Sequence, residues 1–589
     1  MEYVRKQAKL MWNRTVDDEL LMIFLAVAVG IISGFGAWVF RKTTELVADS
    51  ITLFAESINA VSNPILIVLI PAVGGIFAGF MVVKWAPEAK GHGVPEIVYS
   101  VNVENGKMRL RVPFVKIIAS AFTIGTGGSA GSEGPIAQIG GGFASFVAER
   151  THLSPEHSKI LVMAGVSGSI SAIFNAPLGG VLFGLEIIPR DKKARAVLPL
   201  IVSSVVGTSI GEVILRSTSI FSFPKNISLV PSYIPTHFIM FLIIGVITGI
   251  ASVFWIKGFY AFEDIFDDMK INPILIPALG GLLVGFVLLV MPSVNGLTYA
   301  PINEALSGKV LFTSALLLIL GKFLATSFSI GSGGSGGIFS PTLLMGAMLG
   351  SAFGSILFYI HVQDLPIEFY AVLGMAGLFA ASTRAPLTAI IMTSEMVGDF
   401  KLFLPLMFVV ITAWIVSKSL LASDIYVIKL IRRGVKFENE DDLLDEITVA
   451  SIMSRDLIDV SPKDRLEDVM SVMKETGHTG FPVVTEGKIV GIITEHDINI
   501  ALDNLDMKFW IVDNVCTKKL VMTFEDCPLS IAFLKMDEQH VNRLPVVESK
   551  DSLKLVGWIT RSDVMSAYRK FKTRKRMQEE EEKLFANLE

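Results

Sequence analysis

Long apolar runs with few charges fill most of the chain as far as residue 433. Five of them carry at most one charged residue each, and their lengths are close to the roughly 20 residues that a helix needs to cross a bilayer: 20–40, 64–83, 196–215, 238–256 and 273–291. Other apolar segments are shorter and are interrupted by Gly or Pro, as in helices that cross only part of a membrane. The pattern predicts an all-α polytopic membrane domain with broken helices.

A different pattern begins near residue 449, where amphipathic and alternating segments replace the apolar runs. The segment between Ser461 and Gly477 is predicted to be an amphipathic helix, opened by Ser461-Pro462 and ended by the glycine. The other expected elements are strands 481–484 and 489–494, and then a second helix opened by Pro528 and strands 544–547 and 555–560. We therefore expect two copies of one small α/β unit.

A glycine-rich segment occurs twice in the membrane region. Residues 125–135 read GTGGSAGSEGP and residues 331–341 read GSGGSGGIFSP, so six of eleven positions are identical at an offset of 206, and Glu133 falls on Phe339. Glycine permits an irregular, close-approaching backbone, and proline suits a first helical turn, so each copy predicts a loop that enters a helix. Two helix N-termini inside a bundle can bind an anion. The alternative is that the glycines serve helix packing alone.

The duplication spans roughly 110–190 and 316–400, and the sequence leaves open whether the copies are parallel or inverted. Lys116 and Lys322 occupy matching positions in the two copies. A further segment, KGHGVPE at 90–96, has glycines on both sides of a histidine and a proline after them. It indicates a third helix start, with a surface turn as the alternative.

Composition supports the membrane assignment. The 589 residues are 51% hydrophobic and 18% charged, and the mean hydropathy is +0.58, which is too apolar for a soluble protein of this size. The only cysteines, Cys516 and Cys527, lie in the polar part, so no disulfide framework is expected. Basic residues precede the first apolar run, which predicts an uncleaved first helix with a cytoplasmic N-terminus: Arg5, Lys6, Lys9 and Arg14.

Four motifs resemble, in order, the signature segments of the CLC family of chloride channels and anion/proton exchangers. They are His92 in G-x-G-x-P, Glu133 in G-x-E-G-P, Ile338 and Phe339 in G-x-F-x-P, and Tyr426 after the last apolar run. The whole chain resembles a prokaryotic-type member with a C-terminal pair of CBS modules. The resemblance implies an inverted-repeat membrane fold, a homodimer and one pore in each subunit.

The resemblance also implies roles for single residues. Glu133 is the expected gate, whose carboxylate occupies an anion site and moves away to admit the ion. The backbone amides of Ile338 and Phe339 and the Tyr426 hydroxyl are the expected central anion ligands, although position alone would favour an interfacial tyrosine. The same motifs contribute the other expected anion-site residues: His92, Ser132 and Gly134. A carboxylate at a helix N-terminus competes with an anion for the same amides, and protonation removes the competitor.

Three departures from the family pattern bear on the mechanism. His92 stands where a small hydroxyl residue is usual, which leaves the anion preference open, and Ser132 stands where a basic residue is frequent. Ile187 follows Glu186 at the position where exchangers commonly carry an inner glutamate, and isoleucine cannot carry a proton. Glu133 therefore favours coupled exchange, whereas Ile187 favours passive conduction.

The two α/β copies end in GIITEHD and GWITRSD, which resemble the ends of CBS modules. Thr494, Asp497, Thr560 and Asp563 are the candidates there for holding the ribose and phosphates of ATP, ADP or AMP, and a purely structural role is the alternative. No cofactor is required by this interpretation, and no metal is expected. The charged C-terminal tail is expected to be a solvated helix rather than a lipid-binding patch.

The expected organisation is a transmembrane domain over 1–433 with repeat halves of approximately 20–217 and 237–433, an acidic linker over 434–448, CBS modules over 449–508 and 509–570, and a charged tail over 571–589. The expected function is chloride transport in exchange for protons across the plasma membrane, with the N-terminus and CBS modules in the cytoplasm. A passive gated chloride channel is the alternative. Selectivity for fluoride or another anion, and a CBS-regulated cation transporter, are less favoured. Neither an enzyme nor a nucleic-acid partner is expected.

Overall fold

The computed structural model describes residues 2–57, 64–188, 194–215, 221, 234–297, 299–362, 365–435, 444–445, 447–502, 511–539, 541–549 and 552–571. The chain divides into two compact units, Met1–Val435 and Lys436–Glu589. Most of the acidic linker and nearly all of the charged tail lie outside the described residues, so their predicted character stays a prediction.

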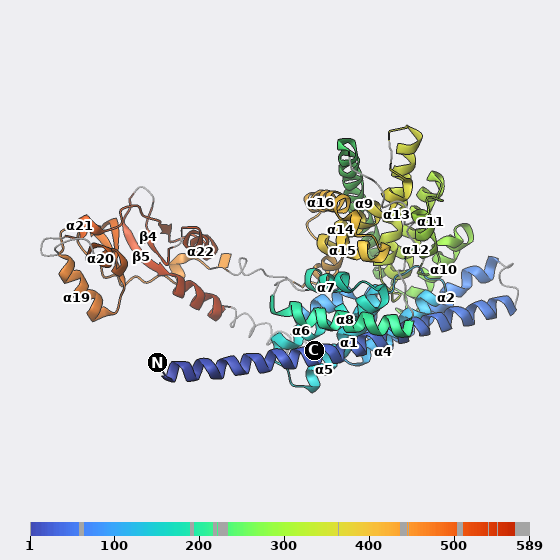
Figure 1. Ribbon diagram of the computed structural model, residues 1–589, viewed down its shortest axis with the longest axis horizontal. Helices are drawn as coiled ribbons and strands as arrows, with labels where there is room; N and C mark the ends of the chain where they lie inside the picture. The colour runs from blue at the N-terminus through green and yellow to red at the C-terminus, as the bar shows by residue number, and fades with distance from the viewer. Residues whose placement is uncertain are drawn as a thin grey trace. The chain divides into compact units, whose positions relative to one another are not determined.

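The first unit is helical (Figure 1). Its described helices are α1 (Glu2–Ser57), α2 (Pro64–Trp85), α3 (Val94–Asn102), α4 (Arg111–Gly125), α5 (Glu133–Arg150), α6 (Pro155–Phe174), α7 (Pro177–Glu186), α8 (Val197–Leu215), α9 (Pro235–Asp267), α10 (Ile276–Val290), α11 (Tyr299–Leu306), α12 (Phe312–Gly331), α13 (Phe339–Tyr359), α14 (Ile367–Thr383), α15 (Pro386–Val397), α16 (Phe403–Leu420) and α17 (Ile425–Arg432). Eight helices of the described chain are long and apolar enough to cross a membrane. Short ones such as α3 and α7, with 9 and 10 residues, confirm the prediction of broken helices.

The two repeats are related by a two-fold rotation. Gly131 N–H donates to Gly337 O and Gly337 N–H donates to Gly131 O, both at 2.7 Å, and these residues are equivalent at the offset of 206. A reciprocal antiparallel pair of equivalent residues requires a two-fold axis between them. Gly127 and Gly333, also equivalent, have φ of 104° and 100°. The two copies are therefore related by two-fold symmetry, as in an inverted repeat.

Close helix contacts are repeated in the two halves as well. A Cβ on Gly140 of α5 would lie 2.3 Å from Gly165 O of α6, and a Cβ on Gly346 of α13 would lie 2.5 Å from Gly374 O of α14. Small residues let these helix pairs approach closely without a hydrophobic driving force from water. The long helices α9 and α16 pack against each other and against α14 of the second pair (Figure 1). The glycines inside these helices thus serve helix packing. The glycines of the two loops do not take part in these helix pairs, so they have another role.

The second unit contains the two predicted α/β copies. The first has α19 (Leu466–Thr476) and the antiparallel strands β1 (Gly480–Thr485) and β2 (Lys488–Thr494), followed by α20 (Glu495–Leu502) and α21 (Val512–Val515). The second has β3 (Thr523–Phe524), α22 (Leu529–Glu538), β4 (Arg543–Val547) and β5 (Leu555–Thr560), with a helix over 561–571. In this sheet β3 is parallel to β4 and β4 is antiparallel to β5. Each copy has its own apolar core.

One predicted boundary in this unit is wrong. Ser461-Pro462 does not open the first helix, because Ser461 N–H donates to Asp464 Oδ2 at 2.7 Å and closes a turn instead. The helix begins at Leu466 after the N-cap residue Arg465, and Gly477 ends it with φ of 71°, as predicted. The Asp464 side chain binds the backbone in a turn, and this turn forms in place of the predicted first residues of the helix.

Candidate functional site

The Glu133 carboxylate lies where the two glycine loops meet. Glu133 is the first residue of α5 and is fully buried, and its Oε1 accepts a hydrogen bond of 2.5 Å from the Phe339 N–H at the start of α13. Its Oε2 has no hydrogen-bond partner among the described residues. A carboxylate of one repeat thus binds the helix N-terminus of the other, where partial positive charge favours an anion.

Two glycines leave the room that this carboxylate fills. A Cβ on Gly131 would lie 2.2 Å from Glu133 Oε2, and a Cβ on Gly337 would lie 1.9 Å from Glu133 Oε1. Neither glycine has a positive φ, so close approach and not backbone conformation requires them. We call the space between Gly131 and Gly337 the carboxylate site.

His92 and Tyr426 lie together on the α17 side of the unit. Both are 1% exposed, and their rings are 5.7 Å apart. The two ring nitrogens of His92 and the Tyr426 hydroxyl have no hydrogen-bond partner in the described part of the chain. Buried polar groups are normally hydrogen-bonded, so these atoms are suited to a small polar ligand. Burial also excludes the interfacial position that was the alternative for Tyr426.

The remaining predicted anion-site residues surround the same helix starts. Ser132 is the N-cap residue of α5 and Ile338 is the N-cap residue of α13. A Cβ on Gly134 would lie 1.9 Å from His92 O, so this glycine allows the His92 loop to pack on the start of α5. The structure therefore brings the predicted residues of all three glycine motifs to one place.

Two buried lysines, Lys116 and Lys322, also lie in this unit, and the sequence motifs assign them no functional role. Lys116 Nζ donates to Ala89 O at 3.0 Å and to Gly91 O at 2.7 Å. Lys322 Nζ donates to Val294 O and Gly296 O, each at 3.1 Å. Both lysines are fully buried, and neither forms an ion pair with a carboxylate of the described chain.

The lysines are important because buried charge is costly without a counter-charge. Their bonds to carbonyl groups hold the turns that precede α3 and α11, and their charges favour an anion between the repeats. The signal for them was present in the sequence, since a lysine at matching positions of two apolar repeats is unusual.

An N-cap and a buried ion pair hold helix α17, which carries Tyr426. Asp424 Oδ1 accepts hydrogen bonds from Tyr426 N–H at 2.9 Å and from Val427 N–H at 3.0 Å, as an N-cap. Lys429 Nζ and Glu263 Oε1 form a buried ion pair of 3.3 Å between α17 and α9. These contacts hold the start of α17, where the Tyr426 ring lies beside His92.

Glu186 and its repeat counterpart Glu395 do not join this site. Glu186 accepts hydrogen bonds from Leu387 N–H at 3.1 Å and from Thr388 N–H at 2.7 Å, at the start of α15. Glu395 accepts them from Leu178 N–H at 3.0 Å and Gly179 N–H at 2.7 Å, at the start of α7. Each glutamate thus caps the opposite short helix.

Ile187 follows directly as the C-cap residue of α7 and is half-buried. It offers no titratable group, as expected from the sequence.

The candidate nucleotide residues form matching caps in the second unit. Thr494 Oγ1 donates to Asp497 Oδ2, and Thr560 Oγ1 donates to Asp563 Oδ2, both at 2.6 Å. Asp497 Oδ1 also accepts a bond of 3.3 Å from Thr517, whereas the described hydrogen bonds to the Asp563 side chain use only Oδ2. These contacts account for the Thr-x-x-Asp spacing by helix capping.

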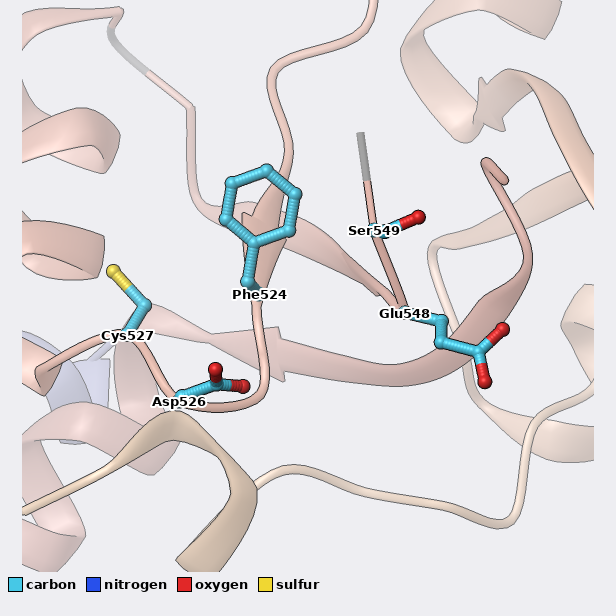
Figure 2. Close-up of a pocket in the computed structure, with 5 residues that line it drawn as sticks. All are labelled: Phe524, Asp526, Cys527, Glu548 and Ser549. Atoms are coloured by element: carbon cyan, nitrogen blue, oxygen red, sulfur yellow. The ribbon is translucent and has the colours of Figure 1, made fainter. Parts of the chain in front are cut away.

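An open hollow of about 460 Å³ lies elsewhere on the second CBS copy (Figure 2). Its lining residues are Phe524, Asp526, Cys527, Glu548 and Ser549. The two acidic residues make it unsuitable for phosphate groups, and the Glu548 carboxylate points away from Phe524 (Figure 2). Cys516 and Cys527 are both free.

The Voltage gated chloride channel family model matches residues 74–418, and the CBS domain model matches 449–504 and 512–570. The chain is 27% identical over 606 residues to the chloride channel protein CLC-f of Arabidopsis thaliana, covering 87% of this chain and 76% of that protein. It is 30% identical over 430 residues to the H(+)/Cl(-) exchange transporter ClcA of Vibrio vulnificus (strain YJ016), covering 70% of this chain and 90% of the relative.

Solved structures agree with these sequence matches. A slow cyanobacterial Cl-/H+ antiporter is similar with a TM-score of 0.63 at 27% identity, over 70% of this chain and 97% of the other. A eukaryotic CLC transporter is similar in fold with a TM-score of 0.62 at 18% identity, over 92% of this chain and 98% of the other. The chain therefore belongs to the voltage gated chloride channel family, and two CBS domains follow its membrane unit.

Proposed function

We propose that this protein moves chloride across the membrane in exchange for protons, with Glu133 as the gate. The observation that carries the proposal is the Glu133 carboxylate on the Phe339 N–H, at a helix start built from both repeats. In their protonated form the buried lysines Lys116 and Lys322 favour an anion in the same region. The similarity to the Vibrio H(+)/Cl(-) exchange transporter and to the cyanobacterial Cl-/H+ antiporter supports the same assignment.

The mechanism follows from competition for one position. While Glu133 is ionised, its carboxylate holds the amide that an anion would bind. Protonation removes the charge of the competitor, and chloride then takes its place. Each departure and return of the carboxyl group can carry one proton. The ionised carboxylate and the anion exclude each other, whereas protonation of Glu133 favours anion occupancy. His92 and Tyr426 would hold the anion on the α17 side through their free polar atoms.

A passive gated channel is the second candidate, and Ile187 is the observation that favours it. Purified protein in liposomes under a chloride gradient, read for anion flux and internal pH together, separates the two. We expect chloride to drive protons uphill. Chloride flux without proton movement would overturn the exchanger and leave the channel.

We expect Glu186→Gln to retain proton coupling. Both Glu186 oxygens already bind the amides that start α15, so this carboxylate is not free to relay protons, and water must supply the inner route. The loss of a charged cap should cost about 1 kcal/mol of stability. The liposome assay checks coupling and thermal melting checks stability, with Glu395→Gln as the matched control. Loss of coupling in Glu186→Gln alone would contradict the expected role.

For the second unit we propose that an adenine nucleotide binds at the CBS pair, at Asp563 in preference to Asp497. The unused Oδ1 of Asp563 is the reason, because both oxygens of Asp497 already have partners. Calorimetry with ATP, ADP and AMP on the fragment from about residue 446 onward should show binding at millimolar concentrations. Asp563→Asn, which keeps a cap acceptor, should weaken it, and the exposed Asp468→Asn should not. No heat from any nucleotide would leave the modules structural.

The assembly and location follow from the family assignment. We infer a homodimer with one pore in each subunit, as the CLC resemblance implies, in the plasma membrane. The N-terminus and the CBS pair would face the cytoplasm, where adenine nucleotides are available. Cross-linking in membranes and protease access from each side test both statements.

A further inference from the structure

A tyrosine hydroxyl of the second repeat lies beside the gate. Tyr299 is the first residue of α11, and its hydroxyl is 3.4 Å from Ser132 Oγ, on the residue directly before Glu133. The Tyr299 side chain is half-buried, and its ring packs edge-on against the buried Phe221 at 5.9 Å.

Repeat symmetry places Tyr299 opposite His92 and Tyr426. Lys116 binds the turn that precedes His92, and Lys322 binds the equivalent turn that precedes Tyr299. The two-fold rotation that exchanges Gly131 and Gly337 also exchanges these turns, so they lie on opposite sides of the axis. The gate therefore has polar aromatic residues on both sides, with Tyr299 on one side and His92 and Tyr426 on the other.

The polar atoms around Tyr299 have unused hydrogen-bonding capacity. A hydroxyl pair at 3.4 Å is longer than the usual 2.7–2.8 Å, so the contact with Ser132 is weak. Ser340, in the first turn of α13, lies near Tyr299, is fully buried and makes no hydrogen bond of good geometry with the described residues. A phenol hydroxyl both donates and accepts, so it can bind a carboxyl group in either protonation state.

We propose that the Tyr299 hydroxyl binds the Glu133 carboxyl group when that group leaves the carboxylate site. Tyr299 is then a positioning residue for the open gate, with Ser132 and Ser340 as its polar surroundings. The proposal rests on the proposed role of Glu133 as the gate. It deepens that role, because it names where the displaced carboxyl group goes.

The structure indicates that removing the Tyr299 hydroxyl should lower anion flux. With the gate closed, Glu133 binds Phe339 N–H, and Tyr299 contributes only the weak contact with Ser132. Removing the phenol hydroxyl therefore costs little in the closed state and one hydrogen bond in the open state. The open fraction falls, and anion flux falls with it by roughly five- to tenfold, which lies within the range expected for the loss of one hydrogen bond between neutral groups.

The test is Tyr299→Phe in liposomes, alone and combined with Glu133→Ala. In the otherwise native protein we expect Tyr299→Phe to lower anion flux by that factor. In the Glu133→Ala background we expect it to change flux by less than about twofold, because no carboxyl group is left to bind the tyrosine hydroxyl. Tyr359→Phe, at an 85% exposed site on α13, is the matched control and should behave as native. Tyr299→His, which keeps a donor, should retain more flux than Tyr299→Phe.

Two results would overturn the proposal. An equal fall in both backgrounds would mean that Tyr299 acts on the anion path or on folding, and an unchanged or increased flux in Tyr299→Phe would mean that it has no role in opening. Glu133→Ala alone separates these results from a failure of the gate itself. If that variant keeps the native pH response and proton coupling, Glu133 is not the gate, whatever Tyr299 does.

Discussion

Glu133→Gln should leave chloride flux present while abolishing its pH dependence and all coupled proton movement. The glutamine amide has the size of the carboxylic acid and no charge, so it mimics a permanently protonated gate. The native carboxylate holds the Phe339 N–H with a charge-assisted bond, and the neutral amide competes with chloride for that N–H much more weakly. Proton coupling is lost because no titratable group remains at this position.

The measurement is the liposome assay with simultaneous flux and pH readout across pH 5 to 8. Glu395→Gln is the matched control, since this carboxylate also binds helix N-terminal amides, at the start of α7. It should keep the native pH response. A Glu133→Gln protein that retained the native pH response would show that the proton acts elsewhere.

Local backbone chemistry explains why so much of the site was predictable. The glycine loops predicted helix starts, and the structure begins α5 at Glu133, α13 at Phe339 and α3 after the N-cap residue Gly93. These features depend on neighbouring residues, because glycine and proline determine the backbone around themselves. The duplication was equally readable, since identical residues recur at a fixed offset.

Contacts between the two repeats could not be predicted from the sequence. Glu186 and Glu395 bind helices about 200 residues away, and only the folded two-fold arrangement brings them there. Tyr299 belongs to no motif, and its place beside Ser132 depends on the same symmetry. The start of α19 was mispredicted for a local reason, because the turn made by Asp464 gives no stronger signal than Ser461-Pro462.

The carboxylate site itself is tested by Gly337→Ala, for which we expect chloride flux to fall by at least about tenfold. The added methyl group would lie 1.9 Å from Glu133 Oε1, far inside van der Waals contact, so the carboxylate must leave. The backbone tolerates alanine there because φ is not positive. If chloride and the carboxylate alternate at this position, the methyl group excludes both of them.

Combining Glu133→Ala with Gly337→Ala shows whether the added methyl group blocks the anion position or only displaces the Glu133 carboxylate. We expect flux to stay low in the double variant, since removing the carboxylate does not remove the methyl group from the anion position. Gly331→Ala, at the end of α12 in the same glycine-rich segment, is the control. The nearest atom to the new Cβ there is 3.4 Å away, and native flux should persist. Recovery of the double variant to the level of Glu133→Ala would show that chloride passes by another route. The carboxylate would then gate the pathway without sharing its binding site with the anion, and competition for the Phe339 amide would no longer explain coupling.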